Sequence, residues 1–377
     1  MAEEISENQD TEEIEKNPAL EILRQLFKEI RSIYARYVEF VDYGAYDFFP
    51  CWIIGTYIFD WFESFPYVYL HAPKRSGKTK ALSLTSKLAS NSIFSVNVSQ
   101  ASLYRVIEER NPTLFIDEAD YLSSEEKAEL YKILNAGYKK GAVVLRCDSA
   151  GKKIELKDWH VYCPKMLASV EELKEQFIDR CITFNLLRSR NKEIANSIIR
   201  ENIDDKGIKW EIWRSGIREQ IPKIKELISQ NFEELDSDER MEKIIGRDRE
   251  LWLPILAIAK TLGSEIYANL INLALDKVEK TKEQEKESIE HGIINELLII
   301  VKEDSWIFVR DVWVALKSKQ EWEWVNIRYI GKVMKRLNFQ FRHSEQGSSY
   351  LIKLAELKEL ARKYGVDIAD VNDVHDV

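Results

Sequence analysis

The sequence has little cysteine and none of it is arranged to hold a metal. Its 377 residues include four cysteines, Cys51, Cys147, Cys163 and Cys181, and no two of them have CxxC spacing. Scattered cysteines argue against a structural zinc site and against a disulfide framework. They fit a protein that works in a reducing compartment.

Long hydrophobic runs are also missing. The most apolar stretch, Phe48–Phe62, is broken by Pro50, Gly55 and Asp60, and it is shorter than the ~20 residues that cross a bilayer. The N-terminus is acidic and lacks the basic start and apolar stretch of a signal peptide. We therefore expect a cytoplasmic protein that has no membrane partner.

An excess of basic charge is the third absence. The chain has 55 Lys and Arg against 64 Asp and Glu, for a net charge of −9. Such a chain cannot coat nucleic acid over its whole surface, so any contact of this kind must come from local basic patches. A hydrophobic content of 45% supports packed cores, and the length indicates two or three domains.

Hydrophobic periodicity divides the chain into segments. Strand-like and helical stretches alternate between about residues 65 and 190, which is typical of an α/β fold with a parallel sheet. We expect an acidic disordered tail at 1–17, a helical region at 18–64, the α/β core at 65–190 with a hairpin at 142–162, a helical region at 191–275, a charged linker at 276–290, a small module at 291–365 and an acidic tail at 366–377.

A phosphate-binding loop is the first chemical signal. The segment APKRSGKT matches GxxxxGK[ST] except that alanine replaces the first glycine. Backbone N–H groups of such a loop wrap a β-phosphate, the lysine reaches the β- and γ-phosphates, and the threonine hydroxyl binds Mg²⁺. The alternative is a basic helix N-terminus without a ligand. The candidate residues are Ala72, Pro73, Lys74, Arg75, Ser76, Gly77, Lys78 and Thr79.

A pair of acids is the second signal. The apolar segment TLFI, 113–116, is followed by Asp117 and Glu118. If this strand is parallel to Tyr67–His71, Asp117 lies beside Thr79 and helps to hold Mg²⁺, while Glu118 polarises the attacking water. An acid pair at a solvated strand end is the alternative. Both signals in the right order favour ATP with Mg²⁺ as the ligand.

These motifs resemble those of AAA+ P-loop ATPases. More narrowly, the sequence resembles the plasmid- and phage-type replicative helicase ATPases of archaea and bacteria over roughly residues 45–265. The matching segments are PYVYLHAPKRSGKT, NPTLFIDEAD, LNAGYKKGAVVLR, CPKMLASVEEL, FIDRCITFNL and GRDRELWLPILAIA. The resemblance implies an AAA+ core, a helical lid at 191–275 and a homo-oligomeric, hexameric ring.

The resemblance also implies roles for three further residues. Ser169 would sense the γ-phosphate, although it also fits a helix N-cap. Arg180 would be the arginine finger for the neighbouring subunit, although it also fits an ion pair with Asp179. Arg247 would be a second sensor for the ATP of its own subunit, with Arg249 as the fallback.

A hairpin is expected between the acid pair and Ser169. Two strand-like runs flank the turn signal Asp148–Gly151, and Lys152 and Lys153 follow it. In helicases of this class such a hairpin projects into the central channel, and lysines at its tip grip single-stranded DNA. A plain surface hairpin is the alternative. Lys139 and Lys140 lie near the base of the hairpin and are possible helpers.

The C-terminal module has the pattern of a winged helix. One helix is expected at Val309–Lys317 and a second at Asn326–Leu337, followed by two strands around a turn at 345–347. The second helix carries a basic stripe that fits the DNA major groove, and the wing adds further basic groups. A protein-binding winged helix is the alternative. The candidate DNA contacts are Arg328, Lys332, Lys335 and Arg336, with Arg342 and His343 in the wing.

Together these features predict an ATP-dependent, ring-forming DNA translocase, a replicative helicase of a plasmid, virus or similar mobile element. A second hypothesis is a replication initiator or regulatory DNA-binding ATPase that uses ATP as an assembly switch. A third is a defence or signalling ATPase whose winged helix binds protein. No primase or nuclease chemistry is visible in the sequence.

Overall fold

The computed structural model describes residues 17–95, 100–117, 124–150, 153–170, 173–199, 210–286, 288–319, 322 and 325–366. The chain divides into two compact units, Met1–Leu275 and Asp276–Val377. The boundary falls within one long helix, α12 (Ser264–Lys286). In the described ranges, no helix combines the length and the apolar character needed to cross a membrane.

The first unit is built on a five-stranded parallel sheet, which confirms the expected α/β class. Its strand order is β2-β3-β6-β1-β7. Every pairing recorded within this sheet is parallel. The carboxyl ends of the strands therefore share one edge. The strands are β1 (Tyr67–His71), β2 (Ser92–Ser95), β3 (Thr113–Ile116), β6 (Lys165–Ser169) and β7 (Cys181–Asn185).

Aromatic side chains fill the core on one face of this sheet. Phe184 of β7 lies 4.8 Å from Phe48 and 5.2 Å from Phe49, measured between ring centroids. Both phenylalanines belong to α3 (Ala45–Gly55), whose Trp52 also contacts Phe115 of β3. Such rings bury large apolar areas, so α3 is fixed against the sheet.

The N-terminal helices differ in part from the expectation. Helix α2 (Pro18–Tyr37) begins where the sequence predicts, with the Asn17 side chain accepting from Ala19 N–H at 3.0 Å. The sequence predicts a break at Gly44–Pro50 followed by a helix at Trp52–Phe62, and this prediction is wrong, because α3 continues through Pro50 and ends at Gly55. A proline inside a helix removes one backbone hydrogen bond, and the burial of the surrounding aromatic residues offsets that loss.

Four helices connect the strands of the core. Helix α4 (Lys78–Leu88) follows β1, and α5 (Gln100–Arg110) lies between β2 and β3. Helix α6 (Ser124–Ala136) precedes the hairpin, and α7 (Glu175–Ile178) precedes β7. This alternation is the arrangement that parallel strands require, since each crossover must return the chain to the same edge.

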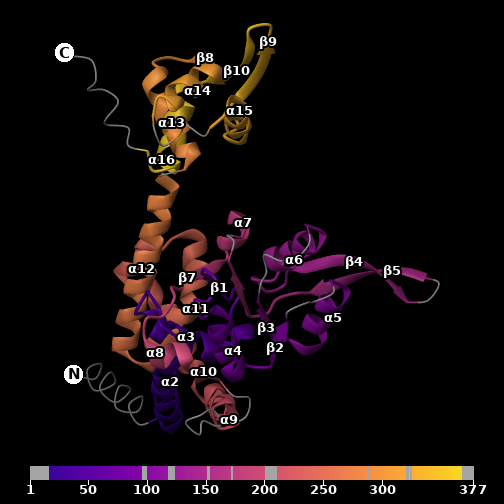
Figure 1. Ribbon diagram of the computed structural model, residues 1–377, viewed down its shortest axis with the longest axis vertical. Helices are drawn as coiled ribbons and strands as arrows, with labels where there is room; N and C mark the ends of the chain where they lie inside the picture. The colour runs from indigo at the N-terminus through magenta and orange to yellow at the C-terminus, as the bar shows by residue number, and fades with distance from the viewer. Residues whose placement is uncertain are drawn as a thin grey trace, which may run out of the picture. The chain divides into compact units, whose positions relative to one another are not determined.

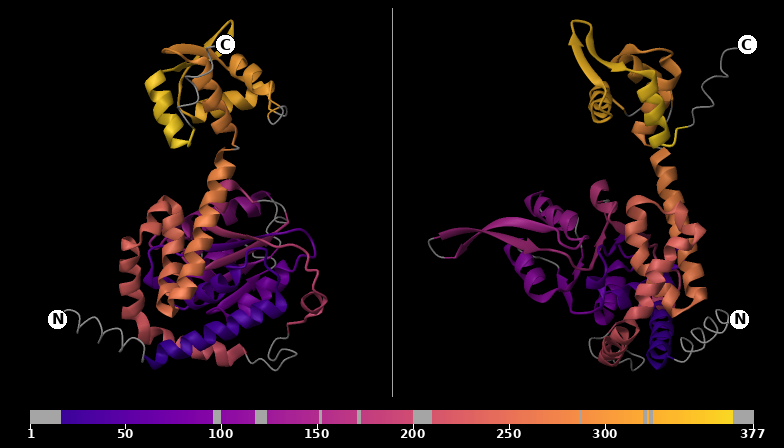
Figure 2. Two further views of the ribbon diagram at one scale, coloured as in Figure 1. Left: turned by 90° about the vertical axis from the view of Figure 1, so that its left-hand side faces the viewer. Right: turned by 180° about the vertical axis from the view of Figure 1, so that it is seen from behind.

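The expected hairpin is present and projects from the body of the first unit (Figures 1 and 2). Strands β4 (Val143–Ala150) and β5 (Lys153–His160) are antiparallel, with Val143 opposite His160 and Ala150 opposite Lys153. Asp148 and Ser149, expected in the turn, are instead paired within β4. The strands therefore extend further toward the tip than the turn signal predicts.

Helices make up the described part of residues 191–275. The α-helices are α8 (Lys192–Asn196), α9 (Trp210–Gln220), α10 (Lys225–Glu234), α11 (Gly246–Leu262) and the first part of α12. Short 3₁₀ turns connect them at Ile221–Ile224, Leu235–Ser237 and Glu239–Lys243. Helix α11 buries one long face that includes Trp252, which contacts Phe48.

The second unit combines helices with a small antiparallel sheet. The strand order is β8-β10-β9, and β9 and β10 form a hairpin. One apolar core joins the helices to the sheet, with Ile330, Val333 and Met334 of α15 fully buried. The elements are α13 (Ile289–Ile300), β8 (Ser305–Phe308), α14 (Val309–Lys317), α15 (Ile327–Arg336), β9 (Gln340–Ser344), β10 (Gly347–Ile352) and α16 (Leu354–Lys363).

A fully buried lysine lies at the amino end of β6. The Lys165 ammonium donates to the carbonyls of Val161 at 2.9 Å, Cys163 at 3.0 Å and Gly137 at 3.3 Å. Burial lowers the pKa of Lys165. A side chain at Gly137 would meet the Val161 oxygen at 2.2 Å and the Lys165 nitrogen at 2.7 Å. The lysine thus ties the exit of the hairpin to the end of α6.

Candidate nucleotide-binding site

The expected phosphate loop connects β1 to α4. Gly77 has a φ of 93° and Arg75 a φ of 66°, both in the left-handed region. A positive φ at Gly77 turns the chain directly into α4, whose first residue is Lys78. Ala72 is absent from the positive-φ residues and donates its N–H to Ser169 O at 3.3 Å. Its backbone does not require the glycine that the motif usually has.

Two side chains of the loop are positioned to bind an anion. Lys78 is buried, and its ammonium donates to the Ala72 carbonyl at 3.2 Å, which holds it along the loop. The Ser76 hydroxyl is buried and has no hydrogen-bond partner among the described residues. A buried polar atom without a partner is costly, so a ligand that supplies one is favoured.

Asp117 lies beside the loop, as the parallel arrangement predicts. The Thr79 hydroxyl donates to the Asp117 carboxylate at 2.7 Å. The sheet explains this contact, because β3 and β1 are both paired with β6 and end at the same edge. Asp117 is 6% exposed. Glu118, the expected activator of water, lies outside the described residues.

The pair Thr79–Asp117 fits a magnesium ion. Mg²⁺ prefers oxygen ligands and is commonly held by one or two protein groups together with substrate phosphates. A hydroxyl and a carboxylate at hydrogen-bonding distance, next to a buried lysine, supply that donor set. Elsewhere in the described ranges, no group of three or more His, Cys, Asp and Glu side chains could hold a metal.

Ser169 ends β6 between the acid strand and the loop strand. It is fully buried, and its hydroxyl lies 2.6 Å from the Tyr69 hydroxyl. Tyr69 also lies 3.3 Å from His71 Nδ1. The expected sensor residue is therefore at the same sheet edge as Asp117 and the loop, within a polar cluster that fixes its position.

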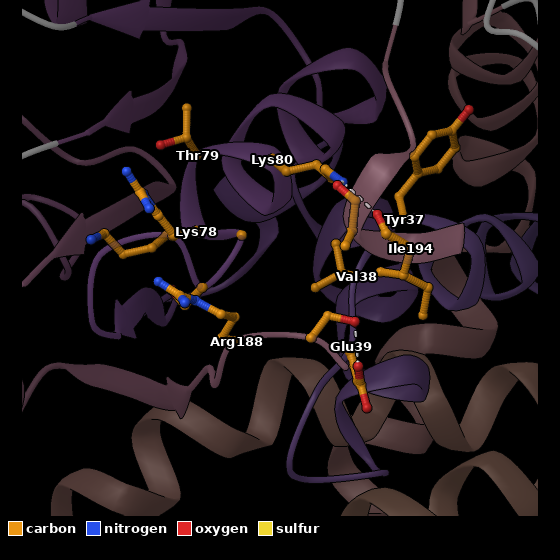
Figure 3. Close-up of a pocket in the computed structure, with 13 residues that line it drawn as sticks. Tyr37, Val38, Glu39, Lys78, Thr79, Lys80, Arg188 and Ile194 are labelled. Atoms are coloured by element: carbon orange, nitrogen blue, oxygen red, sulfur yellow. Dashed lines mark hydrogen bonds between the residues drawn. The ribbon is translucent and has the colours of Figure 1, made fainter. Parts of the chain in front are cut away.

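A cavity of about 340 Å³ adjoins the loop (Figure 3). This volume lies within the range of ~300–1,000 Å³ that is usual for small-molecule sites. Loop residues and α4 form one side of it, while the segment after α2 and the segment after β7 form the rest. The lining residues are Tyr37, Val38, Glu39, Arg75, Ser76, Gly77, Lys78, Thr79, Lys80, Arg188, Ser189, Ile194 and Ala195.

Two side chains, Ser189 and Lys80, hold the far wall of this cavity in place. The Ser189 hydroxyl donates to the Glu39 carboxylate at 2.5 Å. The Lys80 ammonium donates to Ile194 O at 2.6 Å and to the Ser197 hydroxyl at 3.1 Å, which caps the end of α8. Desolvation by burial lowers the pKa of Lys80. The motifs in the sequence do not predict this wall, although the basic run RSR at 188–190 after the last strand is a signal for it.

Arg180 and Arg247 lie together at the opposite edge of the sheet. Arg180 directly precedes β7, and Cys181 is paired with Tyr67, the first residue of β1. Both guanidinium groups stack on Tyr138, at 5.2 Å for Arg180 and 5.7 Å for Arg247. The Arg180 Nε is buried without a partner among the described residues. This edge is separated from the phosphate loop by the length of β1, about 15 Å.

The expected role of Arg247 does not fit this placement. A sensor for the nucleotide of its own subunit must reach the carboxyl edge of the sheet, whereas Arg247 forms an ion pair with Asp179 at the amino edge. The fallback, Arg249, donates to Met241 O at 2.8 Å and pairs with Asp236. Both arginines therefore stabilise the packing around α11 in this conformation.

The ammonium groups of Lys139 and Lys140 also form contacts within the first unit. Lys139 forms a salt bridge with Glu250 at 2.8 Å, and Lys140 donates to Asp60 O at 2.8 Å. Of the two hairpin candidates, Lys152 lies outside the described residues. Lys153 begins β5, and its side chain also lies outside the described part.

The basic stripe of the second unit is on the exposed side of α15. Arg328, Lys332, Lys335 and Arg336 are all exposed, opposite the buried Ile330, Val333 and Met334. Arg336 pairs with Glu290. In the β9 strand Arg342 stacks on Trp306 at 4.3 Å, and His343 Nδ1 lies 3.2 Å from the Ser348 hydroxyl.

Comparisons with known proteins find similarity only among solved structures. No family model matches the sequence, and no curated protein matches it either. The active helicase Cch of SCCmec type IV is 12% identical with a TM-score of 0.44, covering 91% of this chain and 71% of that one. A structure of Drosophila ORC bound to DNA is 11% identical with a TM-score of 0.23, covering 92% and 93%. Cdc6p from Pyrobaculum aerophilum is 12% identical with a TM-score of 0.19, covering 83% and 93%.

Proposed function

We propose that this protein is an AAA+ ATPase that couples ATP hydrolysis to movement along DNA as a homo-oligomeric ring. The observation that carries the proposal is the 2.7 Å contact between Thr79 and Asp117 beside a loop that begins α4. Two segments 38 residues apart in sequence meet there, in the arrangement that nucleoside triphosphate hydrolysis requires.

The described residues suit distinct parts of that reaction. Backbone N–H groups of the loop and the Lys78 ammonium bind the β- and γ-phosphates. Thr79 and Asp117 would hold Mg²⁺, which would supply positive charge against the phosphates. We assign Ser169 to sensing the γ-phosphate and Glu118, which follows Asp117 in the sequence, to activating the attacking water.

The position of Arg180 supports a ring. Because Arg180 lies at the amino edge of the sheet, it cannot reach the phosphate loop of its own subunit. A group of this kind contributes to hydrolysis only when a neighbouring subunit presents its own loop to it. To reach that loop, the guanidinium would have to leave the Tyr138 ring and the Gln176 carbonyl, to which its Nη1 donates.

Two features support DNA as the polymer along which the protein moves. The β4–β5 hairpin projects from the first unit, and the sequence places Lys152 and Lys153 at its tip (Figure 1). The second unit has the element order of a winged helix, with four exposed basic residues along α15. Cationic side chains at such positions bind phosphates without reading sequence. A replicative helicase of a mobile element is the specific assignment that we propose.

The decisive experiment measures ATP hydrolysis by the full chain with and without single-stranded DNA, together with the mass in solution. We expect stimulation by DNA and an oligomeric mass. K78A should abolish hydrolysis, whereas K28A, a matched change at an exposed lysine of α2 that does not line the cavity, should retain most of it. Hydrolysis that survives K78A would contradict the proposal.

Strand displacement separates the helicase from an ATP-switched initiator. A helicase unwinds a forked duplex only with hydrolysable ATP, while an initiator binds its site and assembles without unwinding. An ATPase that DNA does not stimulate would favour the third hypothesis, in which the second unit binds protein.

A further inference from the structure

Arg188 is the basic residue of the cavity that the phosphate-loop motif does not include. It lies three residues after β7 (Cys181–Asn185), and β7 is paired with β1 up to the contact of Leu186 N–H with His71 O. The segment that carries Arg188 therefore runs beside the phosphate loop. Figure 3 shows the Arg188 side chain extending toward the same side of the cavity as Lys78.

The strand order fixes which end of a nucleotide Arg188 can reach. Asp117 follows β3 and Ser169 ends β6, and both strands lie on one side of β1, whereas Arg188 follows β7 on the other side. Thr79 and Asp117 would hold the metal and Ser169 would sense the γ-phosphate, so the γ-phosphate end of the nucleotide is expected toward β3 and β6. The α-phosphate and the nucleoside must then point toward β7.

We propose, on the basis of the function proposed above, that Arg188 is a nucleotide-binding residue that contacts the phosphate nearest the ribose. A guanidinium matches the geometry of phosphate oxygens and forms strong charge-assisted hydrogen bonds with them. Arg188 is exposed, and no hydrogen bond or ion pair involving it is recorded among the described residues, so its donors are available. The contact is common to ATP and ADP and does not report hydrolysis.

Ser189 acts as a positioning residue for Arg188. Its hydroxyl donates to the Glu39 carboxylate at 2.5 Å across the cavity wall, between segments 150 residues apart. This bond fixes the backbone next to Arg188 against the chain that follows α2. A fixed backbone reduces the entropy lost when the arginine side chain closes on a phosphate.

The test measures the binding of ADP and of a non-hydrolysable ATP analogue, each with Mg²⁺, by calorimetry on the full chain. R188A should weaken both ligands by a similar factor of about ten or more, the size expected for one charge-assisted hydrogen bond. R188K should recover part of the loss. S189A should weaken both ligands by a smaller factor. R190A is the matched control, since Arg190 is exposed in the same segment but does not line the cavity, and it should leave both affinities unchanged.

Two outcomes would overturn the inference. If R188A weakens only the ATP analogue, Arg188 contacts the γ-phosphate and the inferred direction of the nucleotide is wrong. If R188A binds both ligands like the unmodified chain, Arg188 does not contact the nucleotide. Absence of nucleotide binding by the unmodified chain is a different result, because it contradicts the proposed function itself. Unchanged thermal unfolding of R188A without ligand checks that the fold is retained.

Discussion

Asp238 is a side chain whose ionisation affects the stability of the helical region. Its carboxylate accepts from Arg240 N–H at 2.9 Å, from Arg240 Nη2 at 2.7 Å and from the Tyr267 hydroxyl at 2.6 Å. The Arg240 side-chain bonds, followed by that of Tyr267, hold the pKa of Asp238 well below its usual range. Because the folded state has the lower pKa, this carboxylate stabilises the fold at neutral pH and loses its contribution as the pH falls below about 4.

We therefore expect D238N to lower the free energy of unfolding at pH 7 by about 1 kcal/mol, because the neutral amide can still cap but loses the ionic contact with Arg240. The difference from the unmodified chain should shrink as the pH is lowered from 5 toward 2. Urea unfolding at several pH values measures both quantities. D236N is a useful comparison, because Asp236 is mostly exposed and has Arg249 as its one ionic partner among the described residues. A D238N deficit that does not change with pH would show that charge is not the cause.

At the residue scale, the site residues that belong to a short local motif could be predicted from the sequence. The site residues that depend on contacts between distant segments could not. The phosphate loop and Asp117 were predictable because a short motif carries their chemistry. Arg188 and Glu39 were not, because their place at the cavity depends on segments 150 residues apart. Lys165 would be assigned to a surface from its type alone, and only the structure shows the three carbonyls that satisfy it.

At the scale of elements, the β4–β5 hairpin carries a direct prediction. The double change K152A/K153A should reduce DNA-stimulated hydrolysis to the unstimulated rate and leave the basal rate intact. K157A on the same strand is the control, since the Lys157 ammonium already lies 3.9 Å from the Trp159 ring. Steady-state ATPase assays with a titration of single-stranded DNA measure the effect. A double variant that DNA stimulates normally would contradict a role for the hairpin tip in gripping DNA.

Helix α15 supports a second prediction at this scale. The change R328A/K332A/K335A should weaken DNA binding uniformly across sequences and reduce its salt dependence, by about 0.9 in log–log slope for each phosphate contact that is lost. K358A/R362A, on the exposed side of α16, should change neither quantity. Fluorescence anisotropy at several salt concentrations measures the slope. An equal effect of both variants would assign the binding to net charge instead of to α15.

Elements were predictable wherever their periodicity was strong. Helices α2 and α11 and strands β1 and β3 appear close to their expected positions. The sequence predicts the second helix too late in the chain, at Trp52–Phe62, because a proline commonly breaks a helix, whereas Pro50 lies inside α3 among buried neighbours. It predicts the turn of the hairpin too early, because Asp148 and Ser149 favour turns by type, whereas cross-strand pairing keeps them in β4.

At the scale of the whole molecule, Arg180 and the phosphate loop lie at opposite edges of the sheet. This separation predicts that two inactive variants, one changed at each edge, complement each other when their subunits are mixed. K78A and R180A should each be inactive alone, with the R180A loss at about 10³-fold or more if it acts as an arginine finger. Mixing the two before assembly should restore some hydrolysis, since an intact loop then faces an intact Arg180. R180A should still bind nucleotide. Failure of every mixing ratio to restore activity would mean that Arg180 acts within its own subunit or only supports the fold.

The close approach of Gly137 to Lys165 has a consequence for how this protein can evolve. Any side chain at position 137 collides with the Val161 carbonyl and with the Lys165 ammonium group. Substitution of Gly137 is therefore disfavoured as long as Lys165 is retained. Replacement of Lys165 removes the collision with the ammonium group but leaves the collision with the Val161 carbonyl. Natural variants should therefore keep glycine at 137 even where 165 has changed, and a lineage that acquires a larger residue there must first have rerouted the hairpin exit.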